Sequence, residues 1–158
     1  MRFLPLFGLL VSSIASADVV INEFLPDPDS TDTDKEWIEI YNNGGAQVDI
    51  TGWKIRAATS TFATKYTFPA TTTIDPGEYI VVAGSLAGIT TPHIDGLGFG
   101  NATSSADAVK LEDDTGATID MVIYGTPNTD KFIGDNGDTT MADKPGADES
   151  LARVTNGV

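Results

Sequence analysis

The feature that most limits how this chain can fold is the spacing of its apolar residues. From residue 18 onward the apolar or alternating runs are short, about four to eight residues each, and they end at clusters of Gly, Pro, Asn, Asp and Thr. No long stretch repeats an apolar residue every 3.6 positions, as an amphipathic helix requires. The spacing therefore predicts an all-β protein.

Nine strands are expected. Seven of them lie at residues 19–25, 36–42, 52–56, 65–68, 79–83, 109–112 and 118–124, and the other two are a short segment at 48–50 and a final one at 150–154. The turn residues at 113–116 predict a hairpin, and the polar stretch 125–149 predicts a long loop. Such a set of strands predicts a β-sandwich with mostly antiparallel pairing.

Two of these strands show which side chains face the core. In residues 37–41 the two isoleucines share one face, while the Trp, Glu and Tyr share the other. In residues 79–83 both faces are apolar, which is typical of a central strand covered on two sides. We therefore expect residues 79–83 to lie at the centre of the core.

Residues 1–17 have the three parts of a signal peptide. Met1 and Arg2 are followed by an almost wholly apolar stretch at 3–11, and residues 15–17 have the small-x-small form of a cleavage site. The apolar stretch is much shorter than the ~20 residues needed to span a bilayer. We expect cleavage after Ala17, one domain at 18–158, export to the cell surface, periplasm or extracellular space, and no membrane insertion after cleavage.

The charge of the chain narrows the choice of partner. It has 9 basic and 23 acidic residues, a formal net charge of −14. Such a surface repels nucleic acid and anionic membranes, because both are bound through Lys and Arg. Cysteine is absent, which excludes disulfides, thiol nucleophiles and Cys-ligated metals.

Several runs occur in an order and at spacings shared by one known family. They are VINE at 20–23, EWIEIYN at 36–42, VDITGWKI at 48–55, IDPGEYIVVA at 74–83, DAVKL at 107–111, IDMVIYG at 119–125 and ESLAR at 149–153. Each run alone is common, whereas the whole ordered set is specific. The chain resembles the lamin tail domain family over nearly all of residues 18–158.

This resemblance implies an immunoglobulin-like β-sandwich. The fold is known from the tails of nuclear intermediate-filament proteins and from many secreted bacterial proteins, where it often accompanies nucleases, phosphoesterases or surface-attachment modules. The signal peptide favours the secreted bacterial type, and the sequence has no heptad rod. Because this fold serves many functions, the function must be argued from particular sites.

One loop concentrates acidic side chains. It carries Asp27, Asp29, Asp32 and Asp34, interspersed with Ser and Thr. Ca²⁺ takes six to eight oxygen ligands, so these four aspartates are predicted to bind Ca²⁺, and no other cofactor is indicated. The EF-hand glycine and the terminal bidentate glutamate are missing, so the alternative is a solvated acidic loop. Residues 135–138 form a weaker patch, for which a turn is the simpler explanation.

The aromatic residues and the single histidine have less specific roles. Trp37 and Trp53 could be stacking platforms for a sugar or peptide, but packing against the fold is the expectation for both. His93 has no nucleophile elbow or other partner motif in the sequence, so no catalytic residue is assigned.

The expected function is a non-enzymatic binding or scaffolding module of the cell envelope or extracellular space, with a protein or glycan partner and a Ca²⁺-ordered loop. One alternative is an accessory domain or fragment of an exported nuclease or phosphoesterase, which the gene sequence beyond Val158 tests. Another is a hydrolase acting at the acidic loop, which assays on phosphodiester and glycoside substrates test.

Overall fold

The computed structural model describes residues 19–90 and 94–157. This part of the chain forms ten strands and no helix: β1 Val19–Leu25, β2 Trp37–Asn42, β3 Val48–Asp49, β4 Lys54–Ala58, β5 Ala63–Thr67, β6 Thr73–Ile74, β7 Tyr79–Ala83, β8 Asp107–Glu112, β9 Thr118–Tyr124 and β10 Leu151–Ala152. The predicted signal peptide lies outside the described residues. Within them, no helix has the length and apolar character to cross a membrane.

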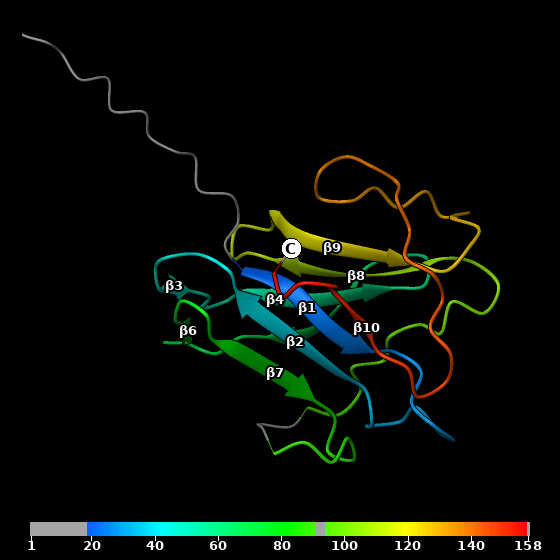
Figure 1. The fold of residues 1–158 in the computed structure, drawn as a ribbon, viewed down its shortest axis with the longest axis horizontal. Helices are drawn as coiled ribbons and strands as arrows, with labels where there is room; N and C mark the ends of the chain where they lie inside the picture. The colour runs from blue at the N-terminus through cyan, green and yellow to red at the C-terminus, as the bar shows by residue number, and fades with distance from the viewer. Residues whose placement is uncertain (1–18, 91–93, 158) are drawn as a thin grey trace, which may run out of the picture.

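Two four-stranded sheets form the layers of a sandwich (Figure 1). Sheet A has the strand order β10-β1-β2-β7, and sheet C has the order β5-β4-β8-β9. Sheet B is a small ribbon of β3 and β6. Every pairing between these strands is antiparallel. The expected all-β, immunoglobulin-like sandwich is confirmed.

The expected strand boundaries agree with the structure for β1, β7 and β9 and differ by at most two residues elsewhere. The sequence pattern misses β6, because two residues in a run of threonines show no alternation and become a strand only by pairing with β3. The predicted hairpin joins β8 to β9, where Asp113 N donates to Ala117 O at 2.9 Å. The predicted long loop follows β9, and Ala142 in that loop forms a bridge to Tyr124.

The inner faces of sheets A and C form the main core. Phe24 meets Tyr124 edge-on with ring centroids 5.3 Å apart, and the Tyr124 hydroxyl donates to Gly100 O at 2.6 Å. Each aliphatic side chain buried here stabilises the fold by roughly 1.5–3 kcal/mol. The largest fully buried side chains include Ile21, Ile38, Ile40, Ile50, Ile55, Ile74, Leu97 and Leu111.

β7 lies at the end of the strand order of sheet A, so the expectation of a central strand covered on two sides is wrong. The central strands of this sheet are β1 and β2. β7 is apolar on both faces for another reason. Its outward side chains belong to a partly exposed aromatic surface, and Tyr79 at its start is 39% exposed.

A β-bulge at Asn22 changes which side chains of β1 face the core. The register with β2 shifts between Ile21 and Glu23, so Asn22 has no opposite residue. Ile21 and Phe24 therefore both point inward although they are an odd number of positions apart. The Asn22 side chain hydrogen-bonds to Glu39, whose side chain belongs to the outer face of sheet A.

Arg153 connects the two sheets where β1 lies beside β9. Its Nη2 donates to both carboxylate oxygens of Asp120, at 2.9 and 2.7 Å, and its Nε donates to Ile21 O at 2.8 Å. The same Asp120 accepts from Ile21 N at 2.7 Å. Asp120 is buried, so this ion pair and its hydrogen bonds tie β9, β1 and the residue after β10 together.

Candidate functional site

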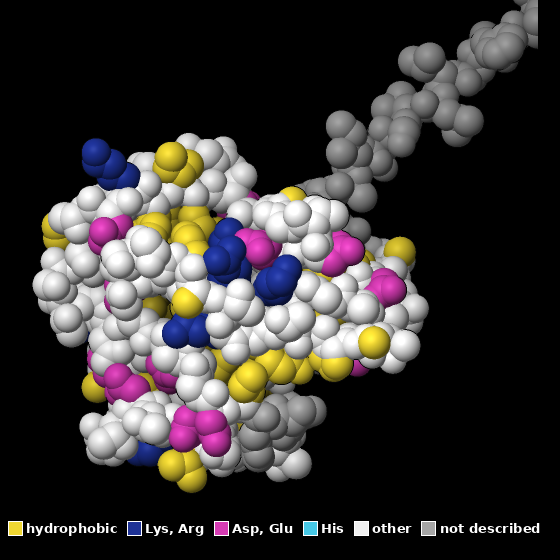
Figure 2. Space-filling view, turned by 180° about the vertical axis from the view of Figure 1, so that it is seen from behind, with side chains coloured by type: hydrophobic (Ala, Val, Ile, Leu, Met, Phe, Trp, Pro, Cys, Tyr) yellow, Lys and Arg dark blue, Asp and Glu magenta, His cyan; other side chains and the backbone are white. Residues whose placement is uncertain are grey.

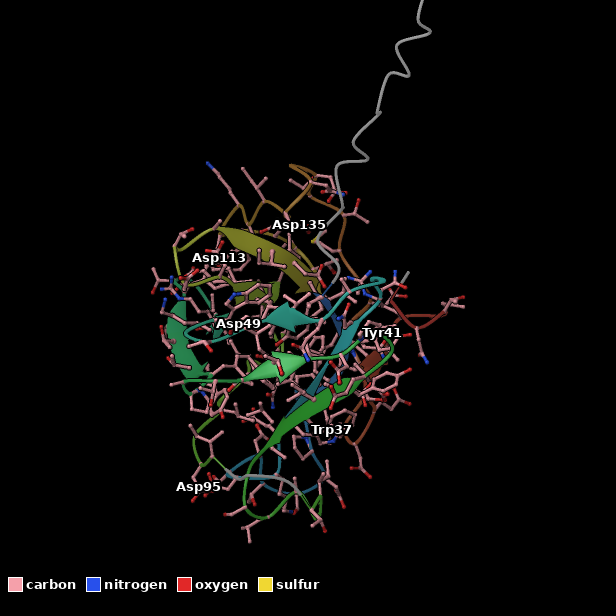
Figure 3. All side chains as sticks on the ribbon, turned by 90° about the vertical axis from the view of Figure 1, so that its left-hand side faces the viewer. Trp37, Tyr41, Asp49, Asp95, Asp113 and Asp135 are labelled. Atoms are coloured by element: carbon pink, nitrogen blue, oxygen red, sulfur yellow. The ribbon has the colours of Figure 1, made fainter. Side chains whose placement is uncertain are left out.

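The outer face of sheet A presents aromatic and acidic side chains together. Side chains alternate between the two faces of a strand, and Ile38 and Ile40 of β2 point toward sheet C. The residues between and beside them in β2 therefore point away from sheet C. In Figure 3 the labelled Trp37 and Tyr41 lie on this side of the molecule. The face consists of Val20, Glu23 and Leu25 from β1, Trp37, Glu39 and Tyr41 from β2, Tyr79, Val81 and Ala83 from β7, and Ala152 from β10.

The two tryptophans differ in their surroundings. Trp53 packs against the main core, as expected. Trp37 is half-buried and belongs to neither core cluster formed by the described residues. The expectation of packing in the core or on a sheet surface therefore holds for both residues: Trp53 packs against the core, and Trp37 lies half-buried on the outer face of sheet A beside Ala83. The alternation of residues 37–41 in the sequence already predicted this position, because it puts Trp37 on the face of the strand that does not carry the isoleucines.

Two tyrosines make a flat slab at one end of this face. The rings of Tyr41 and Tyr79 stack with centroids 4.4 Å apart and planes 28° from parallel. The Tyr79 hydroxyl accepts from Asn156 Nδ2 at 2.6 Å. Partial desolvation, the adjacent Tyr41 and the charge of Glu39 raise the pKa of Tyr79, so its hydroxyl stays protonated at neutral pH.

Two glutamates lie side by side in the middle of the face. Glu23 of β1 is directly opposite Glu39 of β2 in the register. Glu39 Oε1 accepts from Asn22 Nδ2 at 2.8 Å, and Glu23 Oε1 accepts from the Ser150 hydroxyl. Within the described part of the chain neither carboxylate has a Lys or Arg partner within 4.0 Å. Sequence reasoning missed this pair, because it exists only through the pairing of two strands.

The four aspartates predicted to bind Ca²⁺ lie in the loop between β1 and β2. Asn101 Nδ2 donates to Asp27 Oδ1 at 2.9 Å and to Asp32 Oδ2 at 2.8 Å, which brings those two carboxylates together. Asp34 instead accepts from Gly96 N at 2.9 Å. Among the described residues no group of three or more acidic or histidine side chains is placed to hold a metal ion. Asp29 is therefore not gathered with the others, and Ca²⁺ binding stays a prediction.

Glu36 lies at the end of that loop and is buried, with 3% of its surface exposed. Its carboxylate accepts from Phe99 N at 2.7 Å and from Gly98 N, which fixes the segment after Asp95 against β2. Burial raises the pKa of Glu36 to about 7, because the two backbone hydrogen bonds offset only part of the lost hydration. Nothing in the sequence pattern distinguishes Glu36 from the other loop acids.

A groove of about 520 Å³ runs along the seam between β1 and β9. Asp120 and Arg153 line it, and the loop containing Asp135 and Asp138 forms its rim. Asn136 Oδ1 accepts from Asp138 N at 3.1 Å, so the predicted turn at 135–138 is confirmed. The carboxylate of Asp120 is already engaged by Arg153 and by backbone amides, so it is not free to bind a ligand in the groove.

These features define an immunoglobulin-like β-sandwich with an aromatic and acidic outer sheet face. The family model described as the Lamin Tail Domain matches residues 12–126, more than half of the 158 residues. The chain therefore belongs to the lamin tail domain family, a family of non-catalytic immunoglobulin-like domains. No curated protein matches the chain. His93 lies outside the described residues.

Proposed function

We propose that the chain is an exported, non-catalytic binding or scaffolding module of the cell envelope or extracellular space. It holds a protein or glycan partner on the outer face of sheet A. The observation that carries the proposal is the outward position of Trp37 and of the Tyr41–Tyr79 slab on that face. Tyr and Trp dominate binding surfaces because they bury a large area while keeping a polar edge.

The position of this face agrees with such a function. In the described part of the chain no third layer of strands lies on it, and the C-terminal segment crosses only its tyrosine end, where Asn156 donates to the Tyr79 hydroxyl (Figure 1). The signal peptide predicted at residues 1–17 supports export. The loop from β1 to β2 carries the four aspartates, so a bound Ca²⁺ would order the Trp37 end of the same face.

The test is sedimentation of the full chain with isolated cell-envelope material. We expect Trp37→Ala and Tyr79→Ala each to weaken the affinity for this material by about tenfold, the effect of losing roughly 1.4 kcal/mol at an aromatic contact. The matched control is Ile133→Ala, because Ile133 is 60% exposed and lies in the long loop, away from this face. Equal retention of all three variants and the unmodified chain would contradict the proposal.

A further inference from the structure

The glutamate pair on the outer face of sheet A differs from the like-charge pair Arg56 and Lys110 of sheet C, because Glu112 binds both of those cations whereas no cation of the described chain binds the glutamates. Like charges directly opposite each other on neighbouring strands destabilise a sheet, yet Glu23 faces Glu39 in this register. On sheet C, by contrast, the buried Glu112 has Arg56 at 2.9 Å and Lys110 at 2.7 Å. The fold therefore neutralises the carboxylate of one sheet and leaves two carboxylates of the other without a cation.

Half of the eight Lys and Arg residues of the described chain lie in sheet C, on the opposite side of the sandwich. Figure 2, seen from behind, shows Lys and Arg side chains gathered near the middle of that face. Lys54, Arg56, Lys65 and Lys110 belong to the strands of sheet C. The other four described cations lie in loops or after β10, and none of the eight forms an ion pair with Glu23 or Glu39 within 4.0 Å. Neutralisation of Glu23 and Glu39 must therefore come from outside the described chain.

The hydrogen bonds hold both carboxylates in place without using up their acceptors. Asn22 donates to Oε1 of Glu39, and Ser150 donates to Oε1 of Glu23. Within the described residues the Oε2 atoms carry no hydrogen bond. A ligand with N–H donors could therefore bind two oriented oxygen atoms without first having to order the side chains.

Aromatic rings stand on both sides of the carboxylates. Trp37 is two residues before Glu39 and Tyr41 is two residues after it on the same face, so the Cα atoms of the two aromatic residues are about 13 Å apart at a rise of 3.3 Å per residue. A Lys or Arg cation is attracted to an aromatic face within about 6 Å. The face thus combines the two chemistries that recognise a cationic side chain, carboxylate oxygens and ring faces.

We propose that the outer face of sheet A binds an extended segment of a partner protein that carries Lys or Arg, with the cation between Glu23 and Glu39. This inference rests on the proposed function and names the class of partner. A neutral glycan would stack on the rings but would leave the carboxylates unneutralised. A phosphate-bearing polymer would be repelled by them.

The test is calorimetric titration of the full chain with a peptide of alternating Lys and Thr. The same peptide with Glu in place of Lys and a neutral oligosaccharide serve as comparison ligands. We expect only the Lys peptide to bind, with an affinity that falls as salt is added. The Glu23→Gln/Glu39→Gln variant should weaken binding by about tenfold or more, since charge-assisted hydrogen bonds are lost.

The matched control is Asp114→Asn/Asp143→Asn, which removes the same two charges at exposed positions outside sheet A. We expect a loss of affinity below about threefold, the change in long-range attraction alone. As a second readout, Glu23→Gln/Glu39→Gln should unfold at a higher temperature than the unmodified chain, because the repulsion is gone. A lower unfolding temperature would mean that the pair is structural and would overturn the inference.

The remaining outcomes separate this inference from the proposed function. If both double variants weaken binding of the Lys peptide equally, the peptide is attracted only by the net charge of the protein, and the inference is overturned. Oligosaccharide binding that depends on Trp37 but not on the glutamates would also overturn it, while the binding face would stand. If the glutamates instead meet sheet C of a second copy, the chain will self-associate in ultracentrifugation without peptide, and the glutamate variant will be monomeric.

Discussion

At the scale of single residues, Glu36 gives the protein a pH dependence of known sign. Burial raises its pKa in the folded state above the ordinary value of 4.5 to about 7. The folded protein therefore binds a proton more tightly than the unfolded chain does. The stability linked to this proton is fully present below pH 4.5 and is lost as the pH rises through about 7. The loss amounts to roughly 3 kcal/mol at most, at 1.36 kcal/mol per pKa unit.

We expect urea denaturation to show a free energy of unfolding that falls between pH 4.5 and pH 7. In Glu36→Gln this fall should be smaller, because the amide does not titrate. The control is Glu78→Gln, since Glu78 also accepts a backbone hydrogen bond, from Asp75 N at 2.8 Å, but is exposed. The same pH profile in Glu36→Gln and the unmodified chain would refute the assignment.

Alternation along single strands predicted correctly which residues of β2 face inward, and it put Trp37 outward with Glu39. It could not predict the environment of Glu36, because the amides that bind its carboxylate belong to Gly98 and Phe99, far along the chain. The same holds for Glu23, which meets Glu39 only after β1 and β2 pair. Contacts between distant segments are absent from any local pattern.

At the scale of strands, the short β10 is held by Arg153 as much as by its own ladder. β10 pairs with β1 at only two positions, Glu23 with Ala152 and Phe24 with Leu151. Replacing Arg153 by Met would leave the buried carboxylate of Asp120 without its cation, which costs about 3–5 kcal/mol. The strand would then be expected to exchange its amide hydrogens faster than β1 and β2.

We predict that Arg153→Met lowers the free energy of unfolding, measured by urea denaturation, by about 3–5 kcal/mol. Lys144→Met, at an exposed position, should change this free energy little. Adding Asp120→Asn to Arg153→Met should recover part of the loss, because no uncompensated buried charge remains. No recovery in the double variant would show that the packing of Arg153, rather than its charge, holds β10.

The sequence pattern predicts the positions of the strands, but it does not predict the order of the strands in the sheets. The apolar residues of β7 suggested a central strand, whereas the structure puts β7 at the end of sheet A. Apolar side chains on both faces are required for a buried strand, and they are equally required for an end strand that contributes to an aromatic surface. Only the pairing of β2 with β1 and β7 distinguishes the two cases.

At the scale of the whole molecule, an excess of 23 acidic over 9 basic residues makes cations from the medium important. The prediction that Asp27, Asp29, Asp32 and Asp34 bind Ca²⁺ belongs here, because a ligand of the folded state stabilises the entire protein. At a free ion concentration 100 times the dissociation constant the gain is about 2.7 kcal/mol. In the structure two of these carboxylates already lie at one amide, that of Asn101.

We expect the unfolding temperature of the full chain to be several degrees higher in millimolar Ca²⁺ than in EDTA. Asp27→Asn/Asp32→Asn should remove this difference, whereas Asp114→Asn/Asp143→Asn should keep it. An unchanged unfolding temperature would identify the loop as a solvated surface in which Asn101 alone compensates the two carboxylates.

The bulge at Asn22 also limits how this protein can change over evolutionary time. Along a strand, either the odd-numbered or the even-numbered residues face the core. The extra residue changes β1 from one of these arrangements to the other at its midpoint. Before it Ile21 lies on the core side, and after it Phe24 does. A deletion or insertion of one residue in β1 would exchange the core side and the outer side over half the strand. The strand can therefore vary in the identity of its outward side chains, but its length is fixed.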